Sequence, residues 1–240
     1  MPGAGPRWFI HYSVGVSTAR RFDPIPSSKA PGREPASGFI TTLPLRERLR
    51  VETAALHGEL ERRLALLDPT LSRVRYAKVL RAMYGYYSVL EPRLLALAAN
   101  TSASGLPSSF ALELRTPLLE RDLLWLRHDR RALRAIPRCD VLPELEQLEQ
   151  LAGCVYVIEG AALGGQLIVR ELRRRLGVDE SHGAAFFAGG SRNVAARWRG
   201  VVNWLNALPA HHDNHYLAIT SARDTFATLD RWIRLQGASV

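Results

Sequence analysis

The sequence predicts an all-α protein, and two observations carry this prediction. Apolar residues recur every three, four or seven positions in several segments between residues 44 and 235. No segment shows the two-residue alternation that is typical of a half-buried strand. Because short connections separate the periodic segments, we expect six to eight helices packed as a bundle.

The chain is predicted to divide near residue 43. Residues 1–43 are rich in Pro, Gly and Ser and show no sustained periodicity, which indicates a disordered or extraneous N-terminal extension. Residues 44–240 then form one helical domain, since a chain with 47% hydrophobic residues can bury a sizeable core. The apolar stretch 8–16 lacks a clean cleavage pattern, and no stretch approaches the length of a membrane span. We therefore expect no signal peptide and no membrane association.

The first helix is predicted from Pro44 to Leu67, where leucines repeat at helical spacing. His57 lies at the border of the leucine face, where a hydrogen-bonded boundary histidine is more common than a metal ligand. Glu61, one turn later, would either bond the imidazole or face solvent, and solvent is favoured. Arg50 projects from the same side as His57, two turns earlier.

Two further helices are expected before residue 130. The second runs from Ser72 to about Ala99, with a kink or a new segment at Pro92, and its tyrosines are assigned to the core. The third begins at Thr116-Pro117 and runs to about Asp129. A loop over residues 135–143 follows.

The fourth predicted helix, from about Glu144 to Leu176, contains three closely spaced glycines: Gly160, Gly164 and Gly165. Each glycine in a helix interior costs about 0.5–1 kcal/mol relative to alanine. The usual benefit is close approach of the backbone to another group. The sequence leaves two alternatives open, which are tight packing on a neighbouring helix and a bent helix lying across a planar cofactor.

The C-terminal part of the chain is expected to form two more helices. A turn over residues 186–190 precedes a helix from Ser191 to about Leu208, which carries Arg197. The last helix is predicted from His215 to Leu235. The nearby histidines are expected in a solvated loop rather than at a metal site, and they are His211, His212 and His215.

Composition excludes several classes of function. The formal net charge is +9, yet no arginine cluster is interleaved with aromatic residues and no nucleic-acid-binding signature occurs, so nucleic acid is not an expected partner. Glu-x-x-His pairs, which di-iron bundles use, are absent from the sequence. Cys139 and Cys154 form no CxxC pair, which suits a reduced cytoplasm. Cys154 is flanked by apolar residues that should make it unreactive.

Three segments together resemble the heme oxygenase family. Residues 45–61 (LRERLRVETAALHGELE) resemble its proximal helix, and residues 155–166 (VYVIEGAALGGQ) resemble its glycine-rich distal helix. Residues 222–232 look like the last helix of the bacterial, biliverdin-producing branch, which often serves phytochromes. The resemblance extends from about Leu43 to Leu235.

The resemblance implies a fold, a reaction and a set of site residues. The fold is the heme-oxygenase-like multi-helix bundle, and the reaction uses O2 and electrons to convert heme into biliverdin, CO and Fe²⁺. His57 would be the iron ligand, with Gly160, Gly164 and Gly165 close to the distal side of the heme. Arg50 and Arg197 are the candidates for pairing with the heme propionates, with Arg48 and Arg192 as second choices. An acidic external electron donor, such as a ferredoxin or flavodoxin, would suit the basic surface.

One position departs from the family pattern. Many heme oxygenases carry an aspartate directly after the first distal glycine, where this sequence has Ala161. The substitution leaves the proton source unassigned and keeps an alternative open, in which the chain binds heme or biliverdin on the same fold without turning it over. A related bundle enzyme acting on a thiamine-like molecule would need an active-site cysteine with acidic partners, and no convincing set is present.

Overall fold

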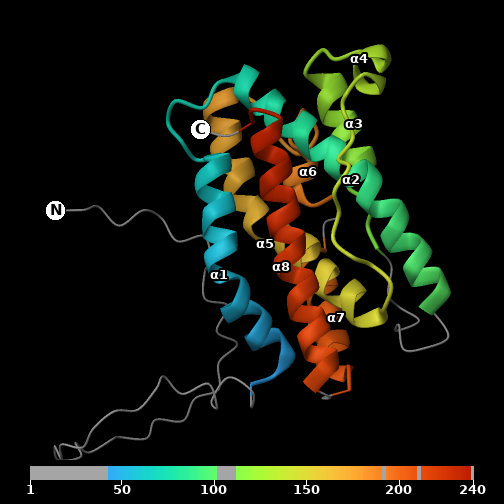
Figure 1. Cartoon of the computed structure of the whole chain (residues 1–240). Coiled ribbons are helices and arrows are strands. Elements are labelled where there is room, and N and C mark those ends of the chain that lie inside the picture. Colours follow the sequence, from blue (N-terminus) through green and yellow to red (C-terminus); the bar gives the residue numbers. More distant parts are fainter. Residues whose placement is uncertain (1–42, 102–111, 191–192, 210–211, 239–240) are drawn as a thin grey trace, which may run out of the picture. The chain divides into compact units, whose positions relative to one another are not determined.

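The computed structural model describes residues 43–101, 112–190, 193–209 and 212–238. All regular elements within these ranges are helices (Figure 1), which confirms the all-α prediction. They are α1 (Leu45–Leu64), α2 (Arg73–Thr101), α3 (Thr116–Trp125), α4 (Arg130–Arg134), α5 (Leu148–Leu176), α6 (Ala185–Ala188), α7 (Val194–Ala207) and α8 (His212–Leu235). The predicted extension before residue 43 lies outside the described residues and stays a prediction.

Helix α5 lies at the centre of the bundle and contacts α2, α6, α7 and α8. Its first turns are buried on every side, because their residues from Leu151 to Glu159 are all buried. Helix α8 contacts both α5 and α1, and α1 also contacts α7. The two helices that carry the predicted heme residues, α1 and α5, are thus both held by α7 and α8.

The close packing of α5 on α8 depends on a small residue. A Cβ built on Gly153 would run into the backbone carbonyl of Ala218. In the same contact, Ser221 donates a hydrogen bond from its hydroxyl to the carbonyl of Gln150 at 2.7 Å. The missing side chain lets two helix backbones approach, which is the packing role that a helical glycine commonly has.

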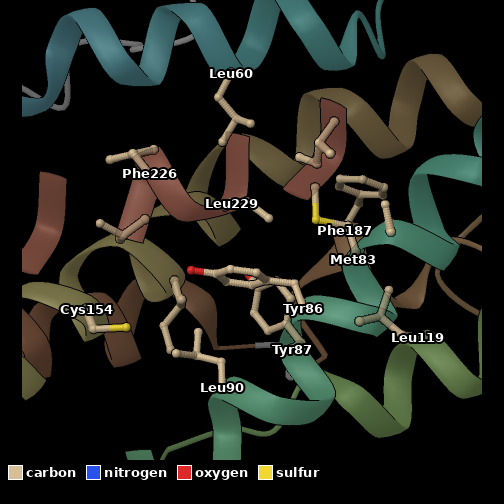
Figure 2. Close-up of a cluster of buried hydrophobic side chains, with 14 of the residues drawn as sticks. Leu60, Met83, Tyr86, Tyr87, Leu90, Leu119, Cys154, Phe187, Phe226 and Leu229 are labelled. Carbon is tan, nitrogen blue, oxygen red and sulfur yellow. The ribbon is translucent and has the colours of Figure 1, made fainter. Parts of the chain in front are cut away.

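The aromatic residues of α2 belong to the core, as the sequence predicts. Tyr76 and Tyr86 are fully buried, and each hydroxyl has a hydrogen-bond partner. The Tyr86 hydroxyl contacts Thr228 Oγ1 at 2.8 Å on α8. Figure 2 shows Tyr86 and Tyr87 of α2 among Leu90, Phe187 and Leu229, so the α2 tyrosines join segments that are far apart in the sequence.

Several predicted boundaries are wrong, for local reasons. Helix α2 continues through Pro92, so no new segment begins there, whereas the alternative of a kink at Pro92 stays a prediction. Helix α3 ends at Trp125, and the turn after it leads to α4, whose first turn is capped by Asp129 through its bond to the Ala132 N–H at 2.7 Å.

The expected turn at residues 186–190 contains the short helix α6. Helix α8 begins at His212, so His215 lies in a helix, whereas His211 lies outside the described residues.

Helix α5 also corrects the expectation that no segment could span a membrane. Among the described residues it is the one helix that is long and apolar enough to cross a bilayer. Most of its apolar stretch is buried inside the bundle. A core helix passes the same test of length and composition, and burial favours that explanation here.

Two glycines in helix interiors should respond to alanine in opposite directions. Gly153→Ala should destabilise the protein by about 1–3 kcal/mol, because the added methyl group meets the Ala218 carbonyl. Gly58→Ala should stabilise it by about 0.5–1 kcal/mol, because a Cβ on Gly58 meets nothing within 4 Å and alanine is the better helix former. Urea unfolding of both variants measures the difference, and equal effects would contradict the assigned packing role.

Candidate functional site

His57 occupies a half-buried position on α1. Its side chain is 24% exposed, and its ring meets the ring of Phe226 on α8 edge-on, with centroids 5.7 Å apart. Burial lowers the pKa of His57 below its usual range. The imidazole is therefore neutral at neutral pH, which is the form that can donate a lone pair to a metal.

Glu61 lies beside His57 and not out in solvent, contrary to the favoured expectation. Its Oε1 lies 3.5 Å from Nδ1 of His57, and the side chain is 31% exposed. Burial raises the pKa of Glu61 to about 7. Since Glu61 approaches Nδ1, the nitrogen that suits a metal is Nε2, and the carboxylate orients the ring, as outer-shell groups commonly do for ligating histidines.

The three glycines of α5 separate into two environments. A Cβ on Gly165 would run into the backbone carbonyl of Phe187, so this glycine serves close packing against α6. A Cβ on Gly164 would meet no atom of the described residues within 4 Å. A Cβ on Gly160 would touch only the Trp198 ring of α7, at 3.5 Å. Gly160 and Gly164 lie four residues apart on one face of α5. The backbone is open to close approach by a flat ligand at Gly164, whereas the Trp198 ring already lies against Gly160.

The two predicted propionate partners are placed very differently. Arg50 is exposed on α1, and its Nε lies 3.1 Å from Glu47. Arg197 on α7 is 19% exposed and is bound by two carboxylates, Glu159 at 3.0 Å and Glu113. The propionate role of both stays a prediction, and Arg50 is the one with its guanidinium facing solvent.

The second choices for propionate pairing do not add a clear partner. Arg48 is buried on α1, and its Nη1 lies 3.4 Å from Nδ1 of His215 on α8. His215 therefore faces α1, and the predicted solvated loop is wrong at this residue. Arg192 lies outside the described residues.

A buried ion network next to Gly160 was missed by sequence reasoning. Glu159 accepts from Arg115 Nη2 and Arg197 Nε, each at 3.0 Å, and its side chain is 4% exposed. Arg115 also donates to the carbonyl of Gly189 at 2.7 Å, and its backbone N–H donates to Glu91. The sequence contains a signal for this network, namely a glutamate within the apolar run 155–159. Such a glutamate must find a cationic partner when it is buried.

Cysteine chemistry is excluded at the centre of α5, as the sequence predicts. Cys154 is buried, and burial raises the pKa of its thiol to about 12. The described residues also contain no group of three or more His, Cys, Asp or Glu side chains that could hold a metal ion. A metal in this site would therefore need further ligands from a framework of its own, and heme provides such a framework.

Comparisons with known proteins identify relatives of this chain in sequence and in fold. A protein-family model described as heme oxygenase matches residues 43–235. The heme oxygenase PigA of Pseudomonas aeruginosa is 27% identical over 182 residues, which are 75% of this chain and 86% of that protein. In structure, the heme oxygenase from Neisseria meningitidis superposes on this chain with a TM-score of 0.66 at 22% sequence identity. The superposition covers 81% of this chain and 92% of the Neisseria chain. Heme oxygenase-2 from Synechocystis, solved with heme and NO, gives a TM-score of 0.65 at 20% identity and covers 81% and 85%.

The raised pKa of Glu61 predicts a pH-dependent stability. Glu61 takes up its proton near pH 7 in the folded chain and near its ordinary pKa of 4.5 in the unfolded chain. The folded state thus holds more protons between these values, and the stability contributed by the protonated group is lost as pH rises through about 7. Glutamine stays neutral at every pH. The free energy of unfolding of Glu61→Gln, relative to that of the wild type, should therefore be higher at pH 8 than at pH 5 by about 1–2 kcal/mol, allowing for solvent screening.

Thermal unfolding of heme-free protein at both pH values measures this gain. The exposed Glu59 on the same helix provides the control, and Glu59→Gln should show no such difference. An equal shift in Tm at pH 5 and pH 8 for Glu61→Gln would contradict a buried, protonated Glu61.

Proposed function

The chain belongs to the heme oxygenase family, a family of enzymes, and we propose that it opens the heme ring with O2 and external electrons, releasing biliverdin, CO and Fe²⁺. Bound heme supplies the redox-active iron on which this reaction depends. The observation that carries the proposal is the neutral, half-buried His57, held between Glu61 and Phe226 on the helix whose sequence resembles the family's proximal helix.

His57 would bind the iron through Nε2. Burial keeps the imidazole uncharged, and Glu61 near Nδ1 limits rotation of the ring. The edge-on contact with Phe226 limits the same rotation from the α8 side. The ligand would therefore meet the iron in one orientation, which reduces the entropy lost on binding.

Gly160 and Gly164 would form the opposite wall. The space beside Gly164 is open, and the Trp198 ring bounds the space beside Gly160. The absence of side chains there would let backbone groups lie against a flat ring and exclude water from it. Arg50 would pair with a propionate at the solvent edge, and Arg197 would contribute there only by exchanging one of its two carboxylate partners.

We further assign the chain to the biliverdin-producing bacterial branch that is associated with phytochromes. Its support is the segment of residues 222–232, which looks like the last helix of that branch. Ala161 cannot hold or move a proton, and Glu159 is already bound by two arginines. Proton delivery would then depend on backbone carbonyls and ordered water. A cytoplasmic location is supported by the two cysteines, Cys139 and Cys154, which form no disulfide.

An acidic electron-transfer protein, such as a ferredoxin or flavodoxin, is the proposed donor. The net charge of +9 supports it, because opposite charge accelerates encounter at low ionic strength. Turnover with ferredoxin should therefore fall severalfold between about 50 mM and about 500 mM salt, over which screening shortens the Debye length. Turnover with ascorbate provides the control and should change little. Ferredoxin-supported turnover that ignores salt would contradict electrostatic docking.

The function is tested by titrating the protein with hemin and then adding ascorbate in air. We expect a saturable one-to-one Soret band that decays into a biliverdin spectrum. His57→Ala should lower turnover by more than about 100-fold, the upper range for loss of an outer-shell partner, while helicity and Tm change little. The exposed His182, paired with Asp179, provides the control variant His182→Ala, which should behave as the wild type.

Three other results would contradict the proposal at different levels. A stable Soret band that never decays would indicate heme binding without turnover. The absence of a Soret band would remove heme as the ligand. Full turnover by His57→Ala would remove His57 from the site while leaving the family assignment intact.

A further inference from the structure

A basic pocket is lined by residues of α2, of α3 and of the turn after α3, and none of its lining residues belongs to the candidate heme site. Its volume is about 810 Å³, and it lies between the first turns of α2 and the C-terminal end of α3 with the residues that follow. This volume falls within the range of small-molecule sites, roughly 300–1,000 Å³. The lining contains five basic side chains and no carboxylate, and the basic residues are Arg73, Lys78, Arg81, Arg127 and His128.

Three of these cations have no ion-pair partner within the part of the chain that the structure describes: Lys78, Arg81 and Arg127. Lys78 is also the single lysine among the described residues. Arg73 differs, since it donates to the carbonyl of Leu176 at 2.6 Å and stacks over the Trp125 ring at 5.7 Å. Cations that share one pocket repel one another, and an anion that binds between them would relieve this repulsion.

Arg127 is held in a backbone conformation that favours glycine. Its φ is +70°, and it lies just beyond the end of α3. The corresponding positive-φ residue after α5 and α6 is a glycine, Gly177 and Gly189 respectively. An arginine at such a position is strained, and strained residues are concentrated at binding and catalytic sites. The strain is consistent with a role for the Arg127 side chain in the pocket.

His128 contributes a buried polar atom to the pocket lining. Its Nδ1 is buried and has no hydrogen-bond partner among the residues that the structure describes. Buried polar atoms are rarely left unpaired, and those that are point to an ordered water or a ligand. A ligand that accepts a hydrogen bond at this depth would satisfy His128 while its charges meet the arginines and the lysine.

The spacing of the cations defines the shape of the ligand. Arg73 and Arg81 are eight residues apart on α2, which corresponds to about 12 Å along the helix axis. Apolar residues also line this stretch, namely Val74, Ala77 and Leu124, and Lys78 lies between the two arginines. A single phosphate or carboxylate cannot reach both ends of this stretch. We propose that the pocket binds an elongated small molecule with an apolar body and at least two separated anionic groups, either carboxylates or phosphates.

The test uses isothermal titration of the full-length protein with two probes. Octane-1,8-diol bisphosphate combines an aliphatic chain with two terminal phosphates, and azelate combines an aliphatic chain with two terminal carboxylates. At least one probe should bind with one-to-one stoichiometry, and which of them binds distinguishes phosphate from carboxylate recognition. Lys78→Glu should weaken that binding at least tenfold. Arg93→Glu provides the control, since it lies exposed on the same helix outside the pocket and should leave binding unchanged.

Arg127→Gly separates a binding role from a structural one. Glycine relieves the positive φ, so the Tm of the variant should rise, while probe binding should weaken at least fivefold because a cation is lost. A higher Tm with unchanged binding would overturn the proposal, as would the absence of saturable binding by either probe. Equal weakening by Lys78→Glu and Arg93→Glu would also overturn it, because it would indicate a general charge effect.

Discussion

The structure depends most on the buried carboxylate of Glu159. Arg115 and Arg197 both donate to it at 3.0 Å, and the side chains of Glu159 and Arg115 are at most 4% exposed. A buried charge is costly unless it is paired, and removing one partner of such a pair commonly costs about 3–5 kcal/mol. Helix α5 can therefore bury Glu159 only when α7 and the segment before α3 are in place. The network joins three parts of the chain that are distant in sequence.

This coupling positions the candidate heme site. Glu159 directly precedes Gly160, and Arg197 directly precedes Trp198, whose ring lies against Gly160. The ion pair between Arg197 and Glu159 thus sets the register of α7 on α5 at Gly160. On the other side, Phe226 of α8 contacts His57, and α8 packs along both α1 and α5. The proximal and distal residues are in this way supported by the same two helices, α7 and α8.

Sequence periodicity predicts the helices because each long helix here has a continuous buried stripe. Periodicity does not predict helix ends that a single hydrogen bond determines. One example is Asp129, whose side chain caps the short helix α4 after α3 has ended. Family resemblance singles out His57 and the α5 glycines, but only the packing distinguishes Gly165, which lies against a backbone carbonyl, from Gly164, which faces open space. The Glu159 network joins Arg115 and Arg197, which are 82 positions apart in the chain, and no local pattern encodes such a pairing.

The central claim is that one histidine on α1 and the glycine face of α5 hold heme between them. A crystal structure of the chain with heme bound tests this claim most directly. We predict that iron is coordinated by His57 Nε2, with the ring plane against Gly160 and Gly164. Iron coordinated by another side chain, or heme bound in the basic pocket beside Lys78, would contradict it.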